Sequence, residues 1–211
     1  MKASFVFDVV SPYAYLAFKR LSQFPVTTNV VYVPVLFAGL LNHFGQLGPA
    51  EIAPKRRFTY RFVLWRARQL GIPMRWPGAH PFNPLMAQRL IVAAGSHRQS
   101  VETVFDAIFK QGGDIRDPRV IEELACSLGI ADASGAVNDP AIKQRLRDNT
   151  DWAITRGVFG VPTLVIGDES FWGLDGMDMA LDYLRHPDLF NDSEMRRLDH
   201  MPVGARRPTK I

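Results

Sequence analysis

The chain opens with the stretch F-V-F-D-V-V-S-P-Y-A-Y-L at residues 5–16, in which a strand passes into a helix. The residues before Ser11 alternate apolar with small or polar side chains, which is typical of a strand. Ser11 is a favoured N-cap, and Pro12 suits the first helical turn because its missing N–H costs no hydrogen bond there. Helical spacing continues to about Phe24, and residues 29–37 are β-branched and aromatic. This order predicts a strand–helix–strand unit with parallel strands.

A long helical pattern separates this unit from the last strands. Asp117-Pro118 and Asp139-Pro140 within it are typical helix starts. The predicted helices cover residues 54–70, 84–95, 100–111, 117–128 and 139–157. Strand character returns only at residues 162–167 and 169–172, and an amphipathic helix covers 176–185. The predicted fold class is therefore α/β, with one small sheet in the order βαβ…ββα and a large all-helical insertion.

This order divides the chain into a discontinuous sheet domain and an inserted domain. We assign residues 1–37 and 158–200 to the sheet domain and residues 38–157 to the helical insertion. The polar, proline-containing segment 201–211 is expected to be a loose C-terminal tail.

The composition is that of an ordinary globular protein, because 47% of the 211 residues are hydrophobic and 22% are charged. No apolar run is long enough to cross a membrane, so we expect no membrane partner. The single cysteine, Cys126, can form neither an intrachain disulfide nor a cysteine metal cluster, which fits a reducing cytoplasm. We expect Cys126 to lie in the core, on the apolar face of a helix.

Charge is distributed unevenly along the chain. Lys and Arg exceed Asp and Glu by 25 to 21, a net charge of +4, but residues 52–101 contain no Asp or Glu at all. The basic residues of that tract are Lys55, Arg56, Arg57, Arg61, Arg66, Arg68, Arg75, Arg89 and Arg98. Such a tract favours an anionic partner, either nucleic acid or an acidic small molecule, or it is a solvated helix face.

Two segments are candidates for a functional site. Ser11 lies where ligands of open α/β sheets bind, beyond the carboxyl end of a strand, although it can equally be a simple helix cap. In G-V-F-G-V-P-T at residues 157–163, Pro162 either begins an edge strand or follows a cis peptide bond. In the cis geometry, the backbone of Val161 is free to pair with an extended peptide ligand.

A third segment, F-W-G-L-D-G at residues 171–176, ends a strand and places Asp175 at the next helix start. With these segments the sequence resembles the 2-hydroxychromene-2-carboxylate isomerases, relatives of the kappa-class glutathione transferases on the DsbA-type thioredoxin fold. The resemblance runs to about residue 185. Its anchors are F-D-V-V-S-P-Y-A-Y-L at 7–16, P-K-R at 54–56, L-G-I-P at 70–73, P-F-N at 81–83, R-G-V-F-G-V-P-T at 156–163 and F-W-G-L-D at 171–175.

The resemblance implies that glutathione is the cofactor, and it assigns residues to glutathione and to the substrate. Ser11 matches the serine that faces the glutathione sulfur, and the backbone of Val161 holds the cysteinyl unit. The residues matching the segment that binds the γ-glutamyl end are Trp172, Gly173, Leu174 and Asp175. The residues implied for the aromatic substrate are Asn83, Pro84, Lys55 and Arg61.

Three positions depart from the family pattern. The family often has Asn or Gln at Leu174, Arg at Gly176 and Asp at Phe62. Two side-chain contacts to glutathione are therefore absent or replaced by backbone groups, and the departures concern the substrate more than the cofactor.

The resemblance implies a glutathione-dependent isomerase that interconverts 2-hydroxychromene-2-carboxylate and trans-o-hydroxybenzylidenepyruvate in aromatic catabolism, acting as a homodimer. The alternatives are a kappa-type glutathione S-transferase for other electrophiles and a non-catalytic binding module on the same fold. Dithiol chemistry is excluded, because the C-x-x-C position reads Ser11-Pro12-Tyr13-Ala14. The five histidines lack metal-ligand spacing, so we expect no metal. The aromatic residues of the basic tract are spaced like a buried helix face, so we expect no nucleic-acid partner.

Overall fold

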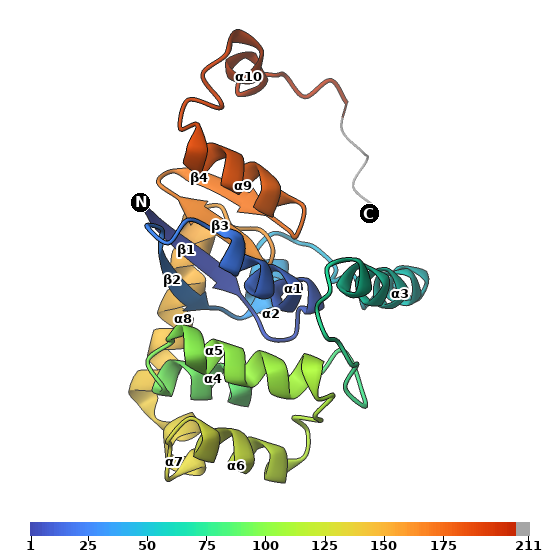
Figure 1. The fold of residues 1–211 in the computed structure, drawn as a ribbon, viewed down its shortest axis with the longest axis vertical. Helices are drawn as coiled ribbons and strands as arrows, with labels where there is room; N and C mark the ends of the chain where they lie inside the picture. Colours follow the sequence, from blue (N-terminus) through green and yellow to red (C-terminus); the bar gives the residue numbers. More distant parts are fainter. Residues whose placement is uncertain (206–211) are drawn as a thin grey trace.

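Four strands form one mixed sheet in the order β2-β1-β3-β4 in the computed structural model, which describes residues 1–205 (Figure 1). β1 (Lys2–Phe7) pairs in parallel with β2 (Asn29–Pro34). β3 (Thr163–Ile166) runs antiparallel to β1, and β4 (Glu169–Trp172) runs antiparallel to β3. The βαβ and ββα units predicted at the two ends of the chain therefore meet in one sheet, as expected.

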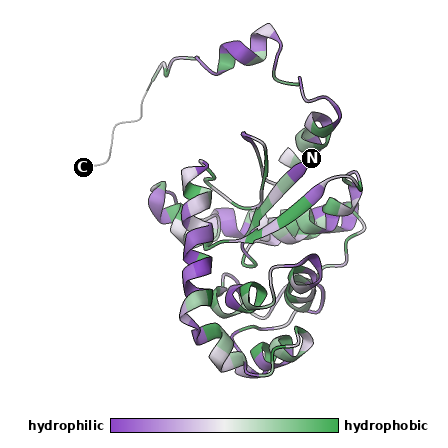
Figure 2. Cartoon of the chain, turned by 90° about the vertical axis from the view of Figure 1, so that its left-hand side faces the viewer, coloured by the Kyte–Doolittle hydropathy of each residue, from purple (hydrophilic) through white to green (hydrophobic). Residues whose placement is uncertain are grey.

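The two faces of the sheet are covered by different helices. Phe5 and Phe7 of β1 point into the larger core, toward α1 (Pro12–Arg20) and α9 (Gly176–Arg185). Val6 points the other way, into a smaller core with Leu40 of α2 (Phe37–His43) and Ala153 of α8 (Pro140–Thr155). This alternation follows the period of two along a strand, and Figure 2 shows the strands coloured as hydrophobic.

The remaining helices lie between the two halves of the sheet in sequence. They are α3 (Ala53–Gln69), α4 (Leu85–Ala93), α5 (Arg98–Phe105), the π-helical turn η2 (Asp106–Lys110), α6 (Pro118–Ser127) and α7 (Ala133–Asn138). In Figure 1, α4 to α7 form a body below the sheet, and α3 projects to one side. Leu90 of α4 and Phe105 of α5 belong to the same core as Phe5 and Phe7, so this body is packed on the sheet.

The thioredoxin-like fold class with many inserted helices is confirmed. Three helices had no clear sequence signal, namely α2, α7 and α10 (Ser193–Leu198). The predicted helix over 100–111 is α5 continued by η2. The expectation for Cys126 is wrong, because its side chain is exposed on α6. The division into two domains stays a prediction.

The C-terminal segment after α9 leaves the body of the molecule. Phe190 still packs on Phe171 and Tyr183, but α10 buries no residue and stands apart in Figures 1 and 2. Of the predicted tail 201–211, residues 206–211 lie outside the described part. Among residues 1–205, no helix is both long and apolar enough to cross a membrane.

Candidate functional site

The start of α1 meets the entrance to β3 at Ser11. Ser11 is the N-cap of α1, and its Oγ accepts a hydrogen bond from the N–H of Ala14 at 3.2 Å. The same hydroxyl lies 3.4 Å from the carbonyl oxygen of Val161, to which it donates. The side chain is only 8% exposed. The structure thus brings together two of the predicted site residues, which come from opposite ends of the chain.

The backbone at this junction leaves donors free. The Val161–Pro162 peptide bond is cis, and the Pro162 carbonyl accepts from the N–H of Gly173 at 2.8 Å. The N–H groups of Val161 and of Tyr13, in the first turn of α1, have no partner among residues 1–205. Free N–H groups at a helix start favour a negative charge.

A tryptophan side chain borders the junction on the β4 side. Trp172 is 55% exposed, and its ring packs on Phe159 with a centroid distance of 5.1 Å. Gly160 lies directly against it, because a Cβ there would stand 2.6 Å from Nε1 of Trp172. Gly173 follows with φ of +83°, a left-handed conformation that glycine adopts readily. Trp172 therefore holds its position because residue 160 has no side chain.

Asp175 begins α9 but does not cap it with its side chain. Its carboxylate is exposed and has no ion pair among the described residues. It lies close enough to Tyr13 to act on that phenol: burial raises the pKa of Tyr13, and the negative charge of Asp175 raises it further. Tyr13 therefore stays neutral beside a free carboxylate.

The two glutathione-segment departures have structural consequences. Leu174 is buried, and its carbonyl accepts from Arg20 Nη1 at 3.4 Å. Gly176 has no room for a side chain, because a Cβ would lie 3.0 Å from the carbonyl carbon of Phe171. The backbone N–H groups of Asp175 and Gly176 have no partner within residues 1–205. Backbone N–H donors are thus present where the family pattern has the polar side chains of Asn or Gln and of Arg.

Lys55 and Arg61, the two residues of the basic helix α3 that were predicted to contact the substrate, lie on different sides of the helix. Its buried stripe is Thr59, Val63 and Ala67. Lys55 lies one turn before Thr59, about 40° from it around the helix axis, whereas Arg61 lies about 200° away. Both side chains are exposed. Lys55 therefore lies on the same side of α3 as Thr59, whose side chain contacts Tyr13 of α1, and Arg61 lies on the opposite side.

Asn83 and Pro84 lie where a loop enters α4. The loop is held beside the site by His80, whose Nε2 is 2.7 Å from the carbonyl oxygen of Val10. Asn83 is exposed, and its Oδ1 accepts from the N–H of Leu85 at 3.0 Å, so part of its role is to begin the helix. Burial lowers the pKa of His80, which keeps this anchor neutral.

Asp8 is a residue of the site that the sequence analysis did not single out. It is fully buried at the end of β1, where Oδ1 accepts from Val10 N–H at 3.0 Å and Oδ2 from Phe37 N–H at 2.9 Å. Burial raises its pKa to about 7. An aspartate inside an apolar strand was the available signal. Asp8 fixes the turn that leads to Ser11.

The family described as DSBA-like thioredoxin domain matches residues 3–185. Glutathione S-transferase kappa 2 of Caenorhabditis elegans is 29% identical over 206 residues, covering 87% of this chain and 91% of the relative. The 2-hydroxychromene-2-carboxylate isomerase of Pseudomonas putida is 31% identical over 191 residues, covering 85% and 92%.

Solved structures agree in fold. A structure of 2-hydroxychromene-2-carboxylate isomerase superposes with a TM-score of 0.78 at 24% identity, covering 96% of this chain and 100% of the other. A probable DsbA oxidoreductase from Streptomyces coelicolor follows with a TM-score of 0.66 at 18% identity, covering 100% and 93%. The resemblance found in the sequence motifs is thereby confirmed.

Proposed function

The chain belongs to the DSBA-like thioredoxin domain family, and from this premise we propose that it is a glutathione-dependent isomerase. Its proposed reaction interconverts 2-hydroxychromene-2-carboxylate and trans-o-hydroxybenzylidenepyruvate. The observation that carries the proposal is the buried hydroxyl of Ser11, held at the start of α1 against the carbonyl oxygen of Val161. The position that holds a cysteine in dithiol enzymes of this fold is a hydroxyl here, so the reacting thiol comes from a ligand.

The residues present fit glutathione. A thiolate is stabilised by the Ser11 hydroxyl and by the free N–H of Tyr13, since both lie at the start of a helix. The free N–H of Val161 suits the peptide backbone of the cysteinyl unit. The Asp175 carboxylate, which has no ion pair within residues 1–205, suits the ammonium group of the γ-glutamyl end, and the N–H groups of Asp175 and Gly176 suit its carboxylate.

Each residue has a distinct part in the proposed reaction. When bound, glutathione supplies a thiolate that adds reversibly to the enone of the open substrate, so that a double bond becomes a freely rotating single bond. Ser11 turns its proton from Val161 to the sulfur and holds the negative charge there. Lys55 neutralises the carboxylate of the substrate, and Tyr13, kept neutral, donates a hydrogen bond at the site. Asn83 and Pro84 border the aromatic ring.

The proposal is tested by following chromene ring opening by absorbance with reduced glutathione, with S-methylglutathione and without either. Turnover with reduced glutathione alone supports it, because S-methylglutathione fills the same site but has no thiol. Equal rates under the three conditions contradict it.

A kappa-type transferase is the second candidate. Of the two predicted cations of α3 only Lys55 lies on the side of Thr59, and Trp172 and Phe159 leave an exposed aromatic border that suits neutral electrophiles. A broad range of neutral electrophiles turned over with glutathione, faster than the chromene, favours this activity. A binding module without catalysis predicts instead steep salt dependence of nucleic-acid affinity.

We also propose that the protein is a homodimer that uses the aromatic ridge of α3, made of Phe58, Phe62 and Trp65. Phe58 and Trp65 are 64% and 51% exposed, and each ring lies 5.6 Å from that of Phe62. Large exposed aromatic side chains that stack on each other are typical of contact surfaces. Sedimentation of Phe58→Ser as a monomer beside a dimeric wild type supports this assignment.

A further inference from the structure

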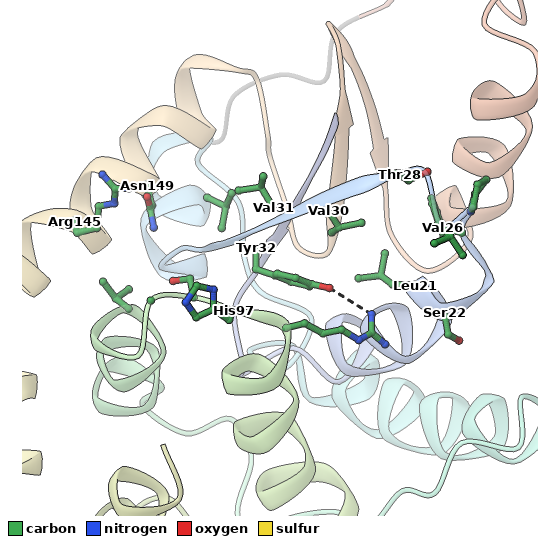
Figure 3. A pocket seen from close by; sticks show the side chains of 17 residues that line it. Leu21, Ser22, Val26, Thr28, Val30, Val31, Tyr32, His97, Arg145 and Asn149 are labelled. Atoms are coloured by element: carbon green, nitrogen blue, oxygen red, sulfur yellow. Dashed lines mark hydrogen bonds between the residues drawn. The ribbon is translucent and has the colours of Figure 1, made fainter. Parts of the chain in front are cut away.

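A groove runs along the open edge of the sheet, away from the site described above. It has a volume of about 890 Å³ and follows β2, one of the two edge strands (Figure 3). The turn after α1, with Leu21 and Val26, forms one wall, and the start of α5, with His97, and α8, with Arg145, form the other. β2 is half-buried at the floor between them.

The floor of the groove offers unpaired backbone groups. The N–H groups of Asn29 and Val35 point to β1, where they reach Met1 and Phe7 carbonyls at 2.9 Å. Because N–H and C=O of one residue point to the same side, both backbone groups of Val30 and Tyr32 face the groove. None of them has a partner among residues 1–205. This is the free half of a β ladder.

Both ends of this free ladder are closed by the protein. At one end, Asn149 Nδ2 of α8 donates to the carbonyl oxygen of Pro34 at 3.1 Å. At the other, the N–H of Thr28 donates to Pro25 at 2.8 Å. The open positions are therefore confined to Val30 and Tyr32, which suits a short segment.

Positive charge flanks the free ladder on both faces of the sheet. Arg98 lies on the side of Tyr32, to whose hydroxyl it donates at 3.4 Å, with its guanidinium 5.3 Å from the centre of the Phe18 ring. Arg145 lies on the other side, on α8. Neither arginine has an ion pair within the described residues, and the described lining contains no Asp or Glu.

We propose that this groove binds an extended acidic segment of a partner protein as an added strand beside β2. Alternate side chains of a strand point to opposite faces, so carboxylates an odd number of residues apart meet Arg98 and Arg145 together. A second copy of this chain fits less well, because its own β2 lies on the floor of the same groove, behind both walls.

The test uses a short fluorescein-labelled peptide with two adjacent glutamates in a Val/Thr-rich sequence. Its control peptides carry glutamine or lysine in place of glutamate, or N-methylated backbone amides. Anisotropy measures binding, and amide hydrogen exchange by NMR reports the place. We expect the amides of Val30 and Tyr32 to gain protection on addition of the peptide, while those of Val31 and Val33, already paired with β1, change little.

Variants separate the charges from the ladder. Arg145→Gln and Arg98→Gln are each expected to lower the affinity for the peptide about three- to tenfold. Arg147→Gln, on α8 but outside the groove, leaves this affinity unchanged. Val30→Pro removes an outward N–H and is tolerated at an edge, so it too weakens binding about three- to tenfold. If Val30→Pro fails to fold, the arginine variants and the exchange data still decide.

Several outcomes overturn the proposal. One is binding of the glutamine peptide as tight as that of the glutamate peptide, and another is binding that leaves the Val30 and Tyr32 amides unprotected. Protection of these amides that rises with protein concentration in the absence of peptide assigns the groove to a second copy. Displacement of the peptide by a single-stranded oligonucleotide of the same net charge as the peptide assigns the groove to nucleic acid.

Discussion

The hydroxyl of Ser11 and the carbonyl oxygen of Val161 lie 3.4 Å apart, although 150 residues separate them in the chain. Ser11 follows β1 and Val161 precedes β3, the strand that pairs with β1, so their contact exists only in the folded sheet. The hydroxyl is the N-cap of α1 at the same time. A ligand atom that replaces the Val161 carbonyl as the acceptor receives the same proton, and this exchange is the basis of the proposed thiol activation.

Ser11→Ala removes both roles of this hydroxyl. We expect a loss of about 1 kcal/mol in unfolding free energy from the missing cap. We also expect a fall in kcat/KM of up to about thirtyfold, since the hydroxyl supplies part of the roughly 1–2 kcal/mol that it and the helix start provide together. Denaturant unfolding and steady-state kinetics with glutathione measure the two effects.

The control for Ser11→Ala is Asp132→Ala, which removes the cap of α7. It is expected to cost similar stability and to leave kcat/KM unchanged. A loss of activity in both variants in proportion to stability means that Ser11 has only a structural role.

Gly160→Ala tests the place of Trp172. The added Cβ meets Nε1 of Trp172 at 2.6 Å and forces the indole to move. We expect the KM for glutathione to rise about three- to tenfold, which corresponds to the loss of about one hydrogen bond or contact. The tryptophan fluorescence should shift as well. Gly78→Ala is the control, since its nearest atom lies at an ordinary 3.5 Å. An unchanged KM would separate Trp172 from glutathione binding.

Lys55→Ala separates isomerase from general transferase activity. A charge-assisted bond to the substrate carboxylate is worth about 1.5–3 kcal/mol, so kcat/KM for the carboxylate-bearing chromene should fall about 10- to 150-fold. For a neutral electrophile the loss should be small. Arg61→Ala, on the far side of the helix, should change neither. Equal losses on charged and neutral substrates would remove the carboxylate-recognition role.

Asp8 gives stability a specific pH dependence. Its folded-state pKa of about 7 exceeds the ordinary value of 3.8, so the folded state binds the extra proton between these values. The free energy of unfolding therefore falls as pH rises through this window and is lowest above pH 7, by a few kcal/mol. His80, with a lowered pKa, acts oppositely: its neutral form stabilises the fold, and this contribution is lost as pH falls below about 6.5.

Asp8→Asn is expected to remove the decrease in unfolding free energy as pH rises toward 7. The increase that His80 causes as pH rises toward about 6.5 should remain. Urea unfolding at a series of pH values gives the slope of unfolding free energy against pH. This slope is the readout, because the new amide also faces the N–H of Phe37 and so changes the absolute stability as well. Asp168→Asn, at an exposed aspartate, should keep the wild-type slope. A wild-type slope in Asp8→Asn would assign the titration to another group.

Local signals were sufficient for most of the fold. Asp117 and Asp139 cap the helices that their Asp-Pro pairs predict, because capping depends only on neighbouring residues. The start of α2 carries no such signal: its first N–H groups are held by Thr150 of α8 and by Asp8. Those partners are distant in sequence, so no local pattern could reveal the helix.

Site residues that belong to a sequence motif could be predicted, whereas those whose role depends on the direction of the side chain could not. The Ser11 and Val161 segments were recognisable, and the structure joins them. Whether Arg61 or Lys55 faces the site depends on the register of α3, which one sequence with a mixed pattern of arginines and aromatics does not fix. Cys126 shows the same limit, since its neighbour Ala125 is buried while Cys126 is turned outward.

The pKa of the glutathione thiol bound to the protein tests the central claim most directly. It is read from thiolate absorbance in a pH titration of the wild type and of Ser11→Ala, both saturated with glutathione. We expect the wild type to hold the thiol pKa at least one unit below its ordinary value of about 8.5, and Ser11→Ala to raise it by about one unit. A bound thiol that titrates at its free value in both proteins would contradict activation at Ser11.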